Sequence, residues 1–180
     1  MKMTYTRVTF ALFLLIGTTS LLYWGGVKGG FAFDDYHNIV ENDALRIEDL
    51  SLSAIMDALF STHSGPTGRP LSMLTFAANA SFFGMEPFSF KVVNILIHGV
   101  NACLVFLLAR LVFRKMMTVT ESQIELSAFL VGFMFAVHPM HLTSVLYVVQ
   151  RMTSLSSLFI LVGLIVFWKA RLLVTYSRDI

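Results

Sequence analysis

An acidic pair is the first feature of this sequence that could carry chemistry. Asp34 and Asp35 are adjacent, and His37 follows them within the segment 31–42. Two carboxylates near an apolar surface repel each other and lose hydration, which raises the pKa of one of them toward that of a general base. Asp35 and His37 would also suit Mg²⁺ or Mn²⁺ as a cofactor. A solvated turn in which one aspartate caps a short helix is the alternative.

A polar stripe runs through an apolar segment further along the chain. Its members are Lys91, Asn94, His98 and Asn101. At this spacing the four side chains share one face of a helix. Hydrogen bonding between membrane helices is the usual role of such residues, and lining a path for a polar ligand is the other interpretation.

Two histidines and an arginine form a third candidate group. His138 and His141 are three residues apart, but Pro139 between them breaks a helix and disfavours a zinc site on one helix face. Arg151 could bind a phosphate through two parallel hydrogen bonds. It could equally extend its charge to ordinary lipid headgroups.

The composition places these residues in a membrane protein. The chain has 180 residues, of which 56% are hydrophobic and only 13% charged, and the apolar residues come in runs. A net charge of +2 gives no indication of a nucleic-acid partner. The single cysteine, Cys103, excludes a disulfide within the chain.

About four transmembrane helices are predicted, at residues 8–24, 89–113, 124–138 and 154–168. The first follows Lys2 and Arg7 and lacks a cleavage motif, so an uncleaved signal-anchor is favoured over a signal peptide. The third and fourth are short and need flanking residues or neighbouring helices to cross the bilayer.

The basic residues gather in the segments 1–7, 114–123 and 169–180, which predicts that these are cytoplasmic. Residues 25–88 then form a large, acidic outer-face loop, and 139–153 form an outer-face amphipathic segment. Helical patterns within the large loop cover Leu50–Phe60 and Pro70–Phe83. The predicted fold class is an all-α integral membrane protein of an inner or plasma membrane.

Five motifs, in order, resemble the amino-terminal membrane module of the transmembrane and tetratricopeptide-repeat family. They are Phe31–Asp35 with Asn38 and Asn42, Gly68–Leu71 with Thr75 and Asn79, Asn94–His98, Phe135–His141, and Val149–Arg151. The resemblance covers nearly the whole chain. These proteins have a C-type glycosyltransferase fold and are similar in membrane layout to protein O-mannosyltransferases, so the resemblance implies part of that fold here.

The resemblance implies transfer of a sugar from a polyprenyl-phosphate donor in the membrane to a hydroxyl of a protein acceptor. Asp34 or Asp35 would be the catalytic base. Arg151, helped by Lys91 or His138, would neutralise the donor phosphate. Residues expected to line the polar site are Asn94, His98, Asn101, Arg69 and His141.

The chain also departs from the family pattern. Many relatives have a glutamate where this chain has Thr143, and they continue into further helices and repeats. The chain is therefore expected to be a fragment, the product of a truncated gene, or half of an assembly that a second membrane subunit completes. The alternative function is a non-catalytic membrane scaffold or accessory subunit. A transporter half is disfavoured because the helix pairs show no internal symmetry. A bacterial inner membrane is the expected location.

Overall fold

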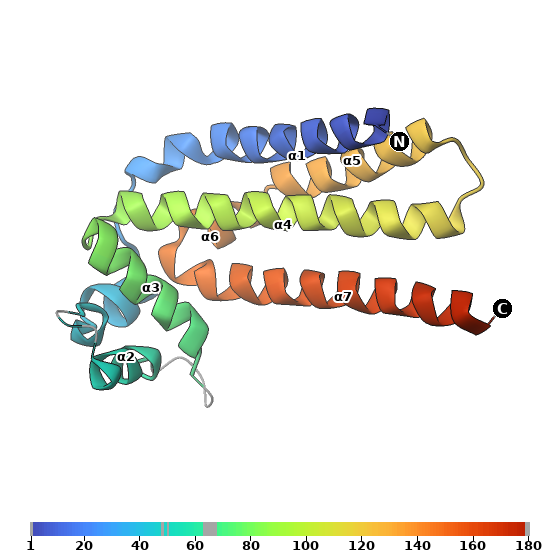
Figure 1. Cartoon of the computed structure of the whole chain (residues 1–180). Helices are drawn as coiled ribbons and strands as arrows, with labels where there is room; N and C mark the ends of the chain where they lie inside the picture. Colours follow the sequence, from blue (N-terminus) through green and yellow to red (C-terminus); the bar gives the residue numbers. More distant parts are fainter. Residues whose placement is uncertain (1, 48, 50, 63–67, 179–180) are drawn as a thin grey trace. The chain divides into compact units, whose positions relative to one another are not determined.

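The computed structural model describes residues 2–47, 49, 51–62 and 68–178, and the regular elements among them are all helices (Figure 1). The elements in chain order are α1 (Lys2–Tyr23), η1 (Trp24–Lys28), η2 (Tyr36–Val40), η3 (Asp43–Leu45), α2 (Leu52–Leu59), α3 (Pro70–Phe83), α4 (Pro87–Met116), α5 (Glu121–Val137), α6 (His141–Leu146), η4 (Val148–Gln150) and α7 (Arg151–Arg178). None of the described residues forms a strand, and the all-α prediction is confirmed.

Three helical segments in the described part of the chain are long and apolar enough to cross a membrane. They are Thr6–Lys28, Pro87–Met116 and Val148–Val174, and they contain the first, second and fourth predicted spans. The protein is therefore an all-α membrane protein, as the composition predicted. The third predicted span coincides with α5, which has 17 residues and a length of about 25 Å. Its crossing of the bilayer stays a prediction.

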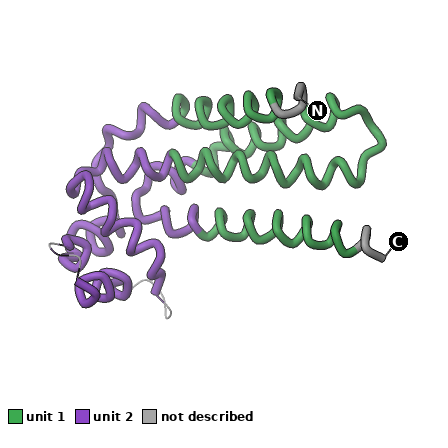
Figure 2. Tube along the Cα trace, viewed as in Figure 1, with its two compact units in different colours: residues 1–22, 96–141, 156–180 green, residues 23–95, 142–155 purple. Residues whose placement is uncertain are grey.

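The chain divides into two compact units (Figure 2). Unit 1 comprises Met1–Leu22, Leu96–His141 and Ser156–Ile180, and unit 2 comprises Tyr23–Ile95 and Leu142–Leu155. The large loop with the acidic pair and the segment around Arg151 thus belong to the same unit.

Small residues let the helices of unit 1 approach closely. A Cβ atom placed on Gly132 of α5 would lie 2.9 Å from the Phe106 Cβ and 3.1 Å from the Ala102 carbonyl oxygen of α4. Cys103 is buried in the same core, which is the packing role expected of a lone cysteine in an apolar run. The shared core consists of Leu15, Ala102, Cys103, Phe106, Ala128 and Ala136.

Polar groups fix the connection between α4 and α5. The Thr120 hydroxyl oxygen accepts a hydrogen bond from the Gln123 N–H, and the Gln123 side-chain oxygen accepts one from the Thr120 N–H. The two bonds form a capping box. Arg110 Nε lies 2.7 Å from Glu125 Oε1, and both side chains are largely buried.

Helices α2 and α3 of unit 2 begin and end where the sequence signals indicate. The Ser51 hydroxyl caps α2, Pro70 occupies the first turn of α3, and Gly84 ends α3 with a positive φ of 74°. The predicted helix Pro70–Phe83 is confirmed. Leu50, the predicted start of the other helix, lies outside the described residues. The core of unit 2 is formed by Ile39, Leu45, Ala58, Met73, Phe76, Ala77, Phe90, Val148, Val149 and Met152.

Candidate functional site

The acidic pair lies on a tight turn that gives its two carboxylates opposite surroundings. Phe33 has a positive φ of 42°, and the Asp35 N–H donates to the Ala32 carbonyl at 2.9 Å. Asp34 is exposed, whereas Asp35 is completely buried. A left-handed backbone at a bulky residue costs free energy and is found most often at functional sites.

Asp35 ties this turn to the segment before α7. Its Oδ1 accepts the Val149 N–H at 2.7 Å, and its Oδ2 accepts the Ala32 N–H at 3.0 Å. Burial raises the pKa of Asp35, while these backbone bonds and the positive charge of Lys91 partly oppose the rise. A raised pKa was expected for one member of the pair, and the structure gives it to Asp35, the buried member.

Tyr147 makes a second connection to the same turn. Its Oη accepts the Asp34 N–H at 2.7 Å, and its ring packs edge-on against Phe33 with 6.5 Å between centroids. The backbone that carries Asp34 is thereby fixed while the residue itself stays exposed.

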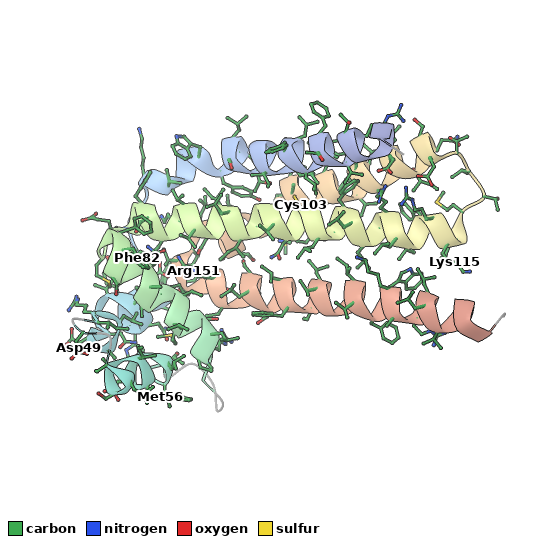
Figure 3. The ribbon with its side chains drawn as sticks, viewed as in Figure 1. Asp49, Met56, Phe82, Cys103, Lys115 and Arg151 are labelled. Atoms are coloured by element: carbon green, nitrogen blue, oxygen red, sulfur yellow. The ribbon has the colours of Figure 1, made fainter. Side chains whose placement is uncertain are left out.

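Arg151, which is labelled in Figure 3, lies at the start of α7 and bonds to α3 and α4. Its Nε donates to Asn94 Oδ1 at 2.8 Å, and its Nη2 donates to Asn79 Oδ1 at 2.8 Å and to the Phe90 carbonyl at 3.0 Å. Its Nη1 donates to the Thr75 carbonyl at 3.1 Å. The side chain is completely buried, and its donors face protein oxygens, which favours a structural role over direct contact with a donor phosphate.

Lys91 and Asn94 support the same region from α4. Lys91 Nζ donates to the carbonyls of Gly29 and Gly30 at 2.8 and 3.0 Å. The Asn94 side chain bonds to Arg151 through its oxygen and donates from Nδ2 to the Val148 carbonyl at 3.2 Å. Both residues are buried. Lys91 holds the segment that leads into the turn of the acidic pair, and Asn94 holds the segment that contacts this turn.

The other half of the polar stripe belongs to unit 1. His98 Nε2 lies 3.2 Å from the Ala136 carbonyl oxygen, and the His98 ring lies 4.9 Å from the ring of His141. His138 is exposed, with its ring 6.1 Å from that of His141, and Asn101 is buried. The four residues of the predicted stripe therefore share one helix but serve two different clusters.

The remaining predicted residues are Arg69 and His37. Arg69 is exposed and points Nη1 toward the Met152 sulfur at 3.2 Å. His37 is exposed, whereas Asp35, its predicted partner as metal ligand, is buried with both oxygens accepting N–H groups. Among the described residues, no three His, Cys, Asp or Glu side chains gather as a metal site would require. These contacts do not fit a cation at Asp35, and the divalent cation stays a prediction.

Sequence reasoning did not single out Tyr147. Its position four residues before Arg151, in a segment predicted only to be amphipathic, gave no signal of a contact with Asp34. Thr75 and Asn79 belong to a family motif, but the sequence assigned them no function. They accept hydrogen bonds from the Arg151 guanidinium, so two of the motifs that carry the resemblance, the one with Thr75 and Asn79 and the one with Arg151, are joined in unit 2.

Comparison with known proteins finds relatives over most of the chain. It is 33% identical over 169 residues to "Protein O-mannosyl-transferase TMTC4" of Mus musculus, which covers 87% of this chain and 23% of that protein. It is 33% identical over 156 residues to "Protein O-mannosyl-transferase TMTC1" of the same species, covering 83% of the chain and 16% of the relative. Identity to "Protein O-mannosyl-transferase TMTC3" of Mus musculus is 29% over 168 residues, covering 88% and 17%.

The chain thus spans less than a quarter of the length of each of these relatives. No family model matches the chain, and no solved structure matches it.

Proposed function

This chain belongs over most of its length to the TMTC-like family, whose named relatives are protein O-mannosyl-transferases, and we propose that it is the amino-terminal part of a membrane glycosyltransferase. The donor is a sugar on a polyprenyl phosphate, and the acceptor is a hydroxyl of a protein on the outer face of the membrane. The remainder of the fold comes from a longer chain or from a second membrane subunit. The bacterial inner membrane stays a prediction, since the relatives compared are animal proteins.

The observation that carries the proposal is the exposed Asp34 on a turn that its neighbours hold in place. A serine or threonine hydroxyl is a weak nucleophile, so a carboxylate beside it accelerates transfer by accepting its proton. Asp34 is the accessible member of the pair and takes this role. The acceptor oxygen bonds to the anomeric carbon, and the bond to the donor phosphate breaks with its electron pair remaining on the phosphate.

Asp35 acts in this proposal as a positioning residue. Its bonds to Ala32 and Val149 fix the turn, and Tyr147 holds the Asp34 N–H. A base whose backbone is held before the acceptor binds has less conformational freedom to lose in the transition state.

The predicted phosphate-binding residues divide into two kinds. Lys91 and Arg151 are buried and bonded to protein oxygens, so they hold the frame of the site. His138 is exposed but belongs to unit 1, so its contact with the donor phosphate stays a prediction. No step in this proposal uses a metal ion.

The test is transfer of labelled mannose from membrane polyprenyl-phosphate donors to protein, in cells with and without the gene. We expect transfer that depends on the gene and that falls when Asp34→Asn is expressed at the wild-type level. Glu86→Gln is the matched control, because Glu86 is an exposed acid of the same loop and outside the turn. Transfer that does not depend on the gene would contradict the proposal and favour the non-catalytic scaffold.

A further inference from the structure

A pocket in unit 1 is lined by residues that the proposed reaction does not use. Its volume is about 300 Å³, and its walls are Lys115 at the end of α4 and Phe167, Trp168, Arg171 and Leu172 on α7. In Figure 3, Lys115 lies at the end of α4 on the side of α7. The pocket therefore combines two cationic groups with aromatic and aliphatic surface.

Arg114 and Lys115 are neighbours in the sequence, but only Lys115 lines the pocket. Arg114 pairs with Glu121 and also lies 3.5 Å from Glu125, so its charge is neutralised at the connection between α4 and α5. No acidic side chain within the described ranges forms an ion pair with Lys115. Lys115 thus adds its positive charge to a pocket that Arg171 also lines.

Trp168 offers a further donor in the same wall. Its indole Nε1 is buried and has no hydrogen-bond acceptor among the described residues. A buried N–H without an acceptor is costly, so a ligand oxygen within reach would gain the bond that the protein does not supply.

We infer that this pocket binds the phosphate headgroup of an anionic phospholipid. Lys115 and Arg171 meet the phosphate, and Phe167, which is 59% exposed, meets the acyl chains together with Leu172. Tryptophan and basic residues at the ends of apolar helices are typical of the depth at which headgroups lie. Basic pockets between membrane helices on the cytoplasmic side recognise anionic headgroups in general.

The sequence predicts that this end of α4 and α7 is cytoplasmic, because Arg114, Lys115, Lys169 and Arg171 follow the two spans. The ligand is then a lipid of the inner leaflet. Lipid binding in this pocket depends neither on sugar transfer nor on the acidic pair.

Trp168 can report binding directly. The chain has two tryptophans, so Trp24→Phe leaves Trp168 as the only indole emitter. The 180-residue chain in a neutral detergent is titrated with short-chain phosphatidylglycerol, with short-chain phosphatidylcholine, and with inorganic phosphate. We expect a saturable change in Trp168 emission with phosphatidylglycerol alone, and a dissociation constant raised about tenfold in Lys115→Gln/Arg171→Gln.

Two control variants separate a built site from general charge attraction. Arg114→Gln and Lys169→Gln each remove one positive charge near the pocket without removing a residue that lines it. Both should bind phosphatidylglycerol as the parent does. Equal responses to the two lipids, no saturable response, or equal weakening by Lys169→Gln would each overturn the inference. A response to inorganic phosphate that matches phosphatidylglycerol would show a site for free phosphate instead.

Discussion

Arg151 connects the start of α7 to α3 and α4 in unit 2. Its guanidinium satisfies four oxygens from α3 and α4 and lies 4.6 Å from the centroid of the Phe76 ring. A buried cation is tolerated only when its donors are used in this way.

Arg151→Met should therefore lower the free energy of unfolding by about 3 kcal/mol or more, because it leaves buried oxygens without donors. Arg46→Met is the control, since Arg46 pairs with Asp43 at the surface and its loss should cost about 1 kcal/mol or less. Denaturant unfolding in detergent measures both. Similar losses in the two variants would show that Arg151 is not a structural anchor.

Asp35 should give unit 2 a stability that depends on pH. Because burial raises its pKa, the folded chain keeps a proton that the unfolded chain releases. The contribution of Asp35 is then fully present below the ordinary aspartate pKa of 3.8 and is lost as the pH rises through the folded value.

The difference in unfolding free energy between the wild-type chain and Asp35→Asn isolates this effect, because other titrating groups cancel. Their curves should converge as the pH rises above the ordinary aspartate pKa of 3.8 and through the raised value in the folded chain. The variant should remain the less stable at low pH, because an amide presents an N–H to one of the two backbone donors that Asp35 accepts. A difference that is constant with pH would contradict the account.

At the scale of elements, helix packing in unit 1 depends on the lack of a side chain at Gly132. Gly132→Leu should destabilise unit 1 by about 2 kcal/mol, because its Cβ would meet Phe106 and Ala102 within 3.1 Å. Gly163→Leu on α7 is the matched control, since nothing lies within 4 Å of a Cβ at that position. Thermal unfolding of the two variants in detergent is the comparison. Equal midpoints would show that the close approach of α4 and α5 is not required.

Elements were largely predictable from the sequence, because their signals are local. Pro70 and Gly84 mark the ends of α3, and the basic residues Arg114 and Lys115 mark the end of α4. The length of α7 was underestimated, since the predicted span 154–168 is part of a helix that runs from Arg151 to Arg178. The prediction places a boundary between Thr153 and Ser154, the end of the amphipathic segment and the start of the span, although such residues also occur within helices.

The sequence singled out several residues that unit 2 brings together, Asp35, Asn94 and Arg151 among them, but it did not indicate their contacts. Adjacent aspartates have different burial only because Asp35 turns toward Val149, a contact between positions 114 residues apart. The burial of Arg151 likewise depends on Asn79 and Asn94, which are 72 and 57 residues away. Contacts between positions so far apart cannot be predicted from spacing or composition. The family motifs did include the partner residues Val149, Asn79 and Asn94.

At the scale of the whole molecule, the chain has an exposed carboxylate, Asp34, on a turn that its neighbours hold, but it spans only part of the length of its relatives. The large loop and the segment that leads into α7 form one unit, which brings the acidic pair and Arg151 into a single network. The relatives TMTC1 and TMTC4 extend far beyond the region shared with this chain. Sugar transfer should therefore be measured in membranes that contain every native partner of the chain.

The most direct measurement is the rate of mannose transfer with Asp34→Asn and with Asp34→Glu at matched protein levels. If Asp34 is the base, Asp34→Asn should lower the rate by about a hundredfold or more, because general base catalysis is lost. Asp34→Glu should keep measurable transfer, because it keeps a carboxylate on the same turn. Wild-type rates in Asp34→Asn would contradict the account and remove the catalytic role from the exposed member of the pair.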